Sequence, residues 1–239
     1  MMKKAIITGH SKGLGAGMVT CMIEAGYEVL GLSRSGIGSE ISGLTEVALD
    51  LGDTAAASAF ATGADFASFL NGATEAVLIN NAGIVEPIAP IGRQDAGKIA
   101  QSMAVNVTAA LILSDAFVAA TEGADRRVVH ISSGAGRNAN TGWSVYCSTK
   151  AAMDMHARAM VEDAVTGLKA ESIAPGVIDT GMQATIRSAP EEDFALLDQF
   201  KSMKAEGGLA KAEDTAAKIC GHILSDRFGA ETITDVRRF

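Results

Sequence analysis

Short aliphatic runs alternate with longer stretches of helical periodicity along the whole chain, and this alternation constrains the fold more than any other feature. Stretches rich in alanine, with apolar residues at helical spacing, occupy 14–25, 54–62, 95–121, 144–166 and 213–225. Alternating strands and helices indicate β-α-β units, whose parallel strands need helices on both faces. The expected fold is α/β, a Rossmann fold with a doubly wound seven-stranded parallel sheet. The expected strands are Ala5–Thr8, Glu28–Leu32, Glu46–Leu49, Ala76–Asn80, Arg127–Ser132, Lys169–Ala174 and Thr232–Val236.

One segment interrupts the alternation of expected strands and helices. The stretch from Thr180 to Gly208 is longer than an ordinary connection and has helical pieces of its own. Such insertions often bind ligands. No internal repeat and no Pro- or Ser-rich linker divides the 239 residues. We therefore expect one domain over residues 1–239, with a substrate lid at about 180–208.

Charge and composition argue against several classes of partner. Lys and Arg number 20 against 28 Asp and Glu, and the net charge of −8 opposes binding to nucleic acid or an anionic membrane. No apolar run approaches the length of a membrane span, and the apolar segment behind Lys3 and Lys4 is too short for a signal peptide. Three distant cysteines without a CxxC pair predict reduced thiols, a cytoplasmic location and no structural metal.

A glycine-rich turn follows the first expected strand and opens the first helix. It reads Thr8-Gly9-His10-Ser11-Lys12-Gly13-Leu14-Gly15, a GxxxGxG spacing that differs from both GxGxxG and the GxxxxGK[ST] phosphate loop. Glycines at such a turn let backbone N–H groups and a helix N-terminus approach a pyrophosphate. The turn indicates a dinucleotide site, although similar turns also serve only to reverse the chain.

Three further motifs lie at strand ends or helix starts. Asn80-Asn81-Ala82-Gly83 ends the fourth strand and Ile131-Ser132-Ser133 ends the fifth, at the edge where parallel sheets bind ligands. Tyr146 and Lys150 are four residues apart and share one helix face. Each motif alone can also be explained without a function, as an ordinary loop or as a pair of side chains on the protein surface. Their order along the chain is what indicates an active site.

With these motifs the chain resembles the short-chain dehydrogenase/reductase family over essentially its whole length. The resemblance implies a nicotinamide cofactor, hydride transfer between that cofactor and a substrate that interconverts between carbonyl and alcohol, and Asn106, Ser133, Tyr146 and Lys150 as catalytic residues. Ser133 is preferred to Ser132 because its separation from Tyr146 is the usual one in the family. The matching residues are Thr8-Gly9-xxx-Gly13-x-Gly15, Asn80-Asn81-Ala82-Gly83, Asn106, Ser133, Tyr146-xxx-Lys150 and Pro175-Gly176.

A narrower likeness and one departure accompany this resemblance. Val177–Gln183 and Gly207–Ala210 are similar to the sepiapterin reductase and benzil reductase branch. The C-terminus, Thr234–Phe239, lacks the family's usual Asp-Gly-Gly, which leaves the quaternary contacts open. By family habit we expect a homodimer or homotetramer, formed through the helices at 95–121 and 144–166.

The cofactor is expected to be NADP(H), with NAD(H) possible. The second strand ends in Ser33-Arg34-Ser35, where NAD sites usually place an acidic residue. Arg34 can pair with a 2′-phosphate, and Lys12 can serve as a second cation on the same side. The alternative is that both residues are surface charges in contact with solvent. The cofactor residues implied are Gly9, Ser11, Lys12, Gly13, Leu14, Gly15, Ser33, Arg34, Asp50, Leu51, Asn81, Ala82, Gly83, Tyr146, Lys150, Pro175, Gly176, Ile178 and Thr180.

The chemistry needs an acid that protonates a carbonyl oxygen, and Tyr146 is the expected one. A phenol at its ordinary pKa of about 10 is too weak an acid. We expect the Lys150 ammonium and the positive nicotinamide to lower that pKa. Ser133 would hydrogen-bond the substrate oxygen. The resemblance gives Asn106 the role of holding a helix irregularity and a water that contacts the lysine.

The substrate residues are expected to be Ser133, Trp143, Tyr146 and Met182. Trp143 can wall the pocket or can simply pack at the surface where its helix starts. Apolar residues of the segment 180–208 favour an apolar or aromatic ketone, unless the segment is only a helical pair that covers the sheet edge. Together with the resemblance to the sepiapterin and benzil reductase branch, they predict reduction of a vicinal dicarbonyl or aromatic ketone. Reduction of 3-oxoacyl thioesters or sugars, or a nucleotide-sensing role without catalysis, are the alternatives.

Two histidines near these motifs are expected to have only local roles. His10 lies in the glycine-rich turn and His130 just before the serines. Neither has a carboxylate beside it in the sequence. We therefore interpret both as hydrogen-bonding groups rather than as acids.

Overall fold

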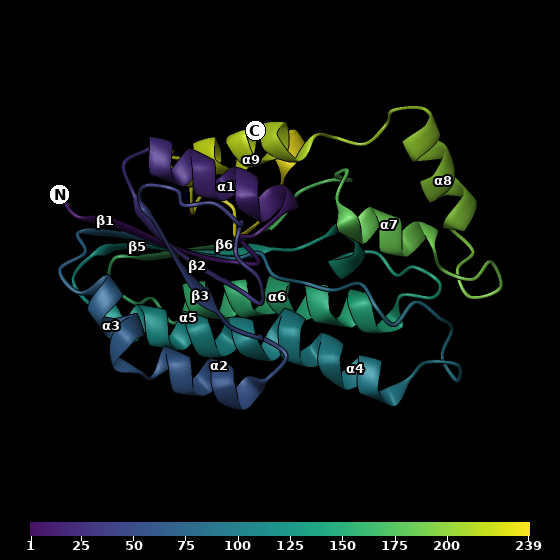
Figure 1. Ribbon diagram of the computed structural model, residues 1–239, viewed down its shortest axis with the longest axis horizontal. Coiled ribbons are helices and arrows are strands. Elements are labelled where there is room, and N and C mark those ends of the chain that lie inside the picture. The colour runs from purple at the N-terminus through teal and green to yellow at the C-terminus, as the bar shows by residue number, and fades with distance from the viewer.

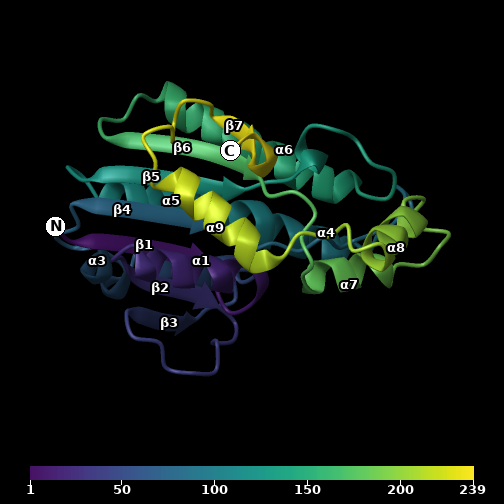
Figure 2. The same cartoon turned by 90° about the horizontal axis from the view of Figure 1, so that it is seen from above.

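Seven strands form one parallel sheet in the order β3-β2-β1-β4-β5-β6-β7 in the computed structural model, which describes residues 1–239 (Figure 2). Every neighbouring pair is parallel, as in the register that places Ile6 opposite Leu30 and Leu78. The doubly wound sheet expected from the sequence is confirmed. The strands are β1 (Lys3–Thr8), β2 (Glu28–Ser33), β3 (Leu44–Ala48), β4 (Glu75–Asn80), β5 (Asp125–Ile131), β6 (Leu168–Ala174) and β7 (Ile233–Asp235).

Helices cover both faces of this sheet (Figure 1). One face carries α1 (Gly13–Glu24) and α9 (Ala212–Ile223). The other carries α2 (Thr54–Ala61), α3 (Ala64–Leu70), α4 (Ala96–Met103), α5 (Ala109–Ala120) and α6 (Ser144–Glu162). Neighbouring residues of a strand point to opposite faces, so Ile7 packs in the core under α1 and Ile6 in the core over α5. This double burial explains the aliphatic runs of the inner strands β1 and β4, whereas Thr45 and Glu46 of the edge strand β3 are exposed.

The segment 180–208 projects beyond the carboxyl ends of the strands (Figure 1). It contains α7 (Gly181–Arg187) and α8 (Leu197–Ala205). Its apolar residues join a separate core that includes Trp143 and Tyr146. The expected helical pieces are therefore present, and they lie against residues of the candidate site.

Several predicted boundaries were wrong. The third strand begins at Leu44, two residues before the expected Glu46. Helix α3 was not expected, because its seven residues are too few to show a clear period. The helix expected over 144–166 ends at Glu162, before Ala164 and Gly167 take positive φ angles of 50° and 75°. The helix expected over 95–121 is divided by a π-helix at Ala104–Thr108.

The helical stretch Ala96–Ala120 has a mean hydropathy of 1.8 and is long and apolar enough to cross a membrane. No uninterrupted apolar run marks it in the sequence, because Asn106 and Ser114 lie within it. A core helix meets the same test, and here Ala109, Leu113 and Phe117 are fully buried against the sheet. The packing therefore assigns this stretch to the helical layer of the fold.

Candidate active site

The glycine-rich turn joins β1 to α1 and is shaped by close backbone contacts. Gly9 and Gly13 have φ angles of 65° and 56°, in the left-handed region that glycine tolerates. A Cβ on Gly15 would lie 2.1 Å from the carbonyl oxygen of Gly9. No side chain caps α1 at this turn, so a ligand can accept from the N–H groups of the first helical turn. This geometry fits the pyrophosphate of a dinucleotide.

Hydrogen bonds tie the end of β4 to this turn. The Thr8 hydroxyl accepts from the backbone N–H groups of Asn81 and Ala82, both at 2.9 Å. Asn81 Nδ2 donates to the carbonyl oxygens of Thr8 and Gly9 at 2.9 and 3.2 Å. Gly83 follows, close to Lys150 Nζ. The predicted cofactor residues from these two motifs therefore share one edge of the sheet.

The other cofactor residues come from three connections at the same edge. Pro175, Gly176 and Ile178 follow β6, and the chain then brings the Thr180 methyl group to 3.2 Å from where a Cβ on Gly13 would lie. After β3, Leu51 is buried, whereas Asp50 accepts a local hydrogen bond from the N–H of Gly52 at 2.9 Å. Ser33, the last residue of β2, is half-buried, and Arg34 after it is exposed. Within the turn, Lys12 is exposed, Ser11 is half-buried and Leu14 is buried.

His10 contradicts the argument made from its sequence neighbours. It is fully buried, and its Nε2 lies 2.6 Å from Glu46 Oε1 on β3. Glu46 also accepts from the N–H of Ile37 at 2.8 Å, and these hydrogen bonds, that from His10 first, lower the pKa of its carboxyl. The role of His10 as a local hydrogen-bonding group holds, but its carboxylate partner comes from a neighbouring strand.

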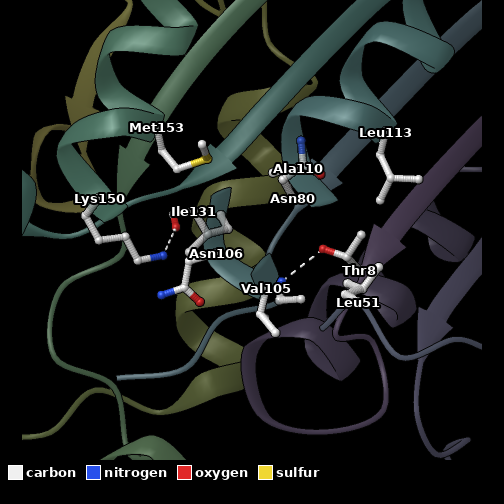
Figure 3. A pocket seen from close by; sticks show the side chains of 11 residues that line it. Thr8, Leu51, Asn80, Val105, Asn106, Ala110, Leu113, Ile131, Lys150 and Met153 are labelled. Atoms are coloured by element: carbon white, nitrogen blue, oxygen red, sulfur yellow. Dashed lines mark hydrogen bonds between the residues drawn. The ribbon is translucent and has the colours of Figure 1, made fainter. Parts of the chain in front are cut away.

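Tyr146 and Lys150 lie on one face of α6, as expected. Lys150 Nζ is 5.7 Å from the centre of the Tyr146 ring and donates to the backbone oxygen of Ile131 at 2.7 Å. Figure 3 shows this bond, with the Lys150 side chain extended toward Asn106. Both residues are buried.

Burial dominates the electrostatics of this pair. Desolvation raises the pKa of Tyr146 to about 12, and a hydrogen bond with Ser133 opposes the shift. Desolvation also lowers the pKa of Lys150 to about 8, although the negative charge of Asp154 acts to raise it. The protein alone therefore does not produce the lowered Tyr146 pKa that was expected from Lys150, because the cost of burying charge is the larger effect.

Ser133 is held at the start of a tight 3-10 turn, Gly134–Gly136. Its Oγ accepts from the N–H of Ala135 at 3.2 Å. The turn packs directly on α6, since a Cβ on Gly136 would lie 2.9 Å from the carbonyl carbon of Lys150. The main chains that carry Ser133 and Lys150 therefore approach each other as closely as glycine allows.

Asn106 lies within the π-helix, so the helix irregularity expected from the family resemblance is present. Its Oδ1 accepts from the N–H of Ile84 at 2.8 Å, and its Nδ2 donates to the oxygen of Ile84 at 2.8 Å. A cavity of about 10 Å³ lies beside it and is also lined by Lys150 and Ile131 (Figure 3). This volume is about that of one water.

Trp143 and Met182 both reach Tyr146. The Tyr146 hydroxyl lies 4.0 Å from Met182 Sδ, and the Trp143 ring is 5.4 Å from the Tyr146 ring in edge-to-face contact. Trp143 is 6% exposed and stacks on Phe194 at 5.0 Å. The alternative that Trp143 simply packs at the protein surface is therefore wrong. The wall around the phenol is apolar and aromatic, and part of it comes from the segment 180–208.

Sequence reasoning missed Asp154, a buried carboxylate one turn beyond Lys150 on α6. Its only sequence signal was the spacing of four residues from Lys150, which places both on one helix face. His130 was interpreted as a hydrogen-bonding group, and its Nε2 lies 3.0 Å from His156 Nδ1. Burial and the neighbouring charges lower the pKa of His130 to about 3, which suits a structural role.

The chain is similar in sequence and in fold to several known proteins. The sequence profile described as short chain dehydrogenase matches residues 3–191. Benzil reductase ((S)-benzoin forming) of Bacillus subtilis (strain 168) is 35% identical over 248 residues, covering 100% of both chains. The enzyme of the same name from Bacillus cereus is 34% identical over 245 residues, covering 95% of this chain and 96% of its own. A solved short-chain dehydrogenase/reductase from Burkholderia vietnamiensis is 41% identical with a TM-score of 0.71, covering 99% of this chain and 97% of its own.

Proposed function

The chain belongs to the short-chain dehydrogenase/reductase family and is an NAD(P)-dependent oxidoreductase, and from this premise we propose that it is an NADP-dependent reductase of ketones or vicinal dicarbonyls with Tyr146 as general acid. One observation carries the proposal. The buried Tyr146 side chain has both polar neighbours, Ser133 and Lys150, and apolar neighbours, Trp143 and Met182.

The chain's own residues account for holding the cofactor. The backbone of Gly9 to Gly15 and the start of α1 would hold the pyrophosphate, and Asn81 to Gly83 would line the route toward Lys150. Thr180 lies against Gly13 and would close the site from the side of α7. When bound, the nicotinamide supplies a hydride to the carbonyl carbon.

The proton comes from Tyr146 and passes to the carbonyl oxygen, so that the ketone becomes an alcohol. Ser133 would hold that oxygen by donating its hydroxyl hydrogen, which stabilises the developing negative charge. The Lys150 ammonium, 5.7 Å from the Tyr146 ring centre, favours the phenolate left behind. Asn106 and the cavity beside Lys150 would hold a water from which a proton returns.

Preference for NADP(H) is the part of the proposal that rests on Arg34 and Lys12. Both are exposed at the cofactor edge, and the guanidinium fork fits a 2′-phosphate. Arg34→Asp should reverse the ratio of kcat/KM for NADPH and NADH. Lys218→Asp, the same change of charge at an exposed position of α9, is the matched control and should leave the ratio unaltered. An unchanged ratio in Arg34→Asp would remove the assignment.

An apolar or aromatic dicarbonyl is the substrate class that the site supports best. Trp143, Phe194 and Phe200 form one aromatic cluster against Tyr146, and two of these rings come from the segment 180–208. We propose that this segment is the substrate lid. The Trp143 indole N–H is buried and has no hydrogen-bond partner, so it is available to a second carbonyl oxygen. The two benzil reductases act on a substrate of this kind.

A panel of carbonyl compounds tests the substrate class. Oxidation of NADPH is followed with benzil-like diketones, sepiapterin-like side-chain ketones, simple sugars and 3-oxoacyl thioesters. The highest kcat/KM is expected for the diketones. A clear advantage for sugars or thioesters would contradict the substrate class, and silence with all substrates despite intact cofactor binding would favour a nucleotide sensor.

We also propose a homodimer or homotetramer, formed through α5 and α6. Large apolar side chains are exposed on these helices, including Met155 at 59% and Leu111 at 37%. Sedimentation should give a mass of two or four chains, and Met155→Glu should lower it. A monomer at micromolar concentration would contradict the proposal.

The proposed compartment is the cytoplasm. Cys21, Cys147 and Cys220 are all free thiols, as suits a reducing compartment. Fractionation of cells that express the chain should recover it in the cytoplasmic fraction, and recovery elsewhere would contradict this.

A further inference from the structure

The Asp154 carboxylate lies at the centre of a buried polar cluster behind the candidate site. Its Oδ1 accepts from the Ser132 hydroxyl at 2.7 Å and from the Ser172 hydroxyl at 2.6 Å. Its Oδ2 accepts from Arg137 Nε at 3.1 Å. The Asp154 side chain is 8% exposed. A carboxylate in such a place is stable only when its oxygens are hydrogen-bonded, and here both are.

The residues bound to Asp154 belong to separate segments around the site. Ser132 is the residue before Ser133, and its own N–H bonds to the oxygen of Ile173 on β6 at 2.8 Å. Arg137 follows the turn Gly134–Gly136 and also donates to the oxygen of Thr234 on β7 at 3.0 Å. Both ends of the short segment that carries Ser133 are therefore held by one carboxylate on α6.

Asp154 also lies one helical turn beyond Lys150, and its charge raises the pKa of that lysine against the effect of burial. The other charged or titratable groups around these two residues are Arg137, which pairs with Asp154, Tyr146, whose ring centre is 5.7 Å from Lys150 Nζ, and His130 of β5, whose pKa Lys150 helps to lower. The charge of Arg137 also helps to lower the pKa of Asp235 on β7. Asp154 is the group in this set that favours the Lys150 ammonium.

We propose that Asp154 is a positioning residue for the proposed reduction: it holds the segment that carries Ser133 against the helix that carries Tyr146 and Lys150. The inference rests on the proposed function for its effect on turnover. Asp154 does not touch the substrate and has no role of its own in proton transfer. Its charge also acts on Lys150 one helical turn away, and substitutions can separate this effect from the tether.

Three variants separate the two effects. Asp154→Asn retains an oxygen that can accept from the serines but removes the charge and the oxygen that accepts from Arg137. Ser132→Ala retains the charge and removes the link to the residue before Ser133. Glu162→Gln, an exposed charge at the end of the same helix, is the matched control.

Each variant is measured for kcat and KM with NADPH and a reduced ketone, and for the titration of Lys150. That titration is followed by NMR of ¹³Cε-labelled lysine in the protein without ligands, and Lys150→Met assigns the signal. In Asp154→Asn, Lys150 should lose its proton about one pH unit lower, as expected on losing a nearby opposite charge. For both site variants kcat should fall on the order of tenfold to a hundredfold, with much smaller changes in KM, because a misplaced group affects the chemical step.

The outcomes are decisive in either direction. An unchanged Lys150 titration in Asp154→Asn overturns the electrostatic role, and an unchanged kcat in Ser132→Ala overturns the tethering role. If Asp154→Asn does not fold, kcat of Ser132→Ala still decides the tether. If the unaltered protein reduces no carbonyl, the proposed function fails, whereas the Lys150 titration still tests the charge effect.

Discussion

Gly136→Ala should damage catalysis although the substitution adds only one methyl group to the turn behind Ser133. The added Cβ would lie 2.9 Å from the carbonyl carbon of Lys150 and 3.0 Å from its oxygen, against 3.4–4 Å for ordinary contact. The atoms it meets are helix backbone, which cannot rotate away as a side chain can. The turn must therefore move from α6 by roughly half an ångström or more.

The size of the effect follows from this displacement. Overpacking of this kind destabilises a protein by about 1–3 kcal/mol. Ser133 moves with the turn, and a misplacement approaching 1 Å lowers the rate by up to about a hundredfold. We expect kcat to fall about tenfold or more and Tm to fall, with cofactor affinity little changed because the glycine-rich turn is separate.

Gly134→Ala is the matched control in the same 3-10 turn. A Cβ at Gly134 would have no atom within 4 Å. This variant should keep its kcat and gain about 0.4–1 kcal/mol of stability, because alanine restricts the unfolded chain. The two variants are compared by steady-state kinetics and thermal unfolding. Equal kcat and equal Tm in both would refute the claim that close approach to α6 positions Ser133.

Three further outcomes test the site. Tyr146→Phe should lower kcat by about a hundredfold to ten-thousandfold while NADPH still binds in a fluorescence titration, and substantial turnover would mean that the acid is misassigned. Lys150→Met should abolish turnover yet raise Tm at pH 7. Burial lowers the pKa of Lys150 in the folded protein to about 8 from 10.5, so the charged ammonium of Lys150 destabilises the folded protein below pH 8. The gain in Tm of Lys150→Met over the unaltered protein should therefore shrink as the pH rises from 8 toward 10.5. A gain in Tm that does not depend on pH would contradict this. Phe194→Ala removes a ring that is only 1% exposed. The variant should have a lower kcat/KM for aromatic ketones, and a protease should cleave it faster within residues 180–208. An unchanged cleavage rate would argue against anchoring of the lid by this ring.

Much of the architecture could be predicted because it is encoded in local pattern. The strand β1 shows the reason: its run of aliphatic residues needs cover on both faces, and the glycines that follow it permit one kind of turn into a helix. The spacing of Tyr146 and Lys150 places them on one face of any helix that contains both. Short elements such as α3 escaped prediction because a helix of two turns has too few residues for its period to stand out.

The pairing of distant side chains could not be predicted in this way. His10 meets Glu46 across 36 residues of sequence, and Asp154 meets Ser132 and Ser172 across 22 and 18. Such contacts depend on the register of neighbouring strands and on the rotation of a helix over the sheet, and neither is a property of a short segment. The pKa of Tyr146 likewise depends on its burial by Trp143 and the segment 180–208.

By itself, then, the sequence determined the order of strands and helices, the glycine-rich turn and the residues that carry the family's chemistry, because periodicity and backbone freedom are local. Only the tertiary structure decided that Trp143 is a buried wall of the site, that Asp154 lies behind Ser133, and that desolvation raises the pKa of the Tyr146 phenol. Those outcomes depend on which groups the fold removes from water together, and that is settled when the helices pack on the sheet.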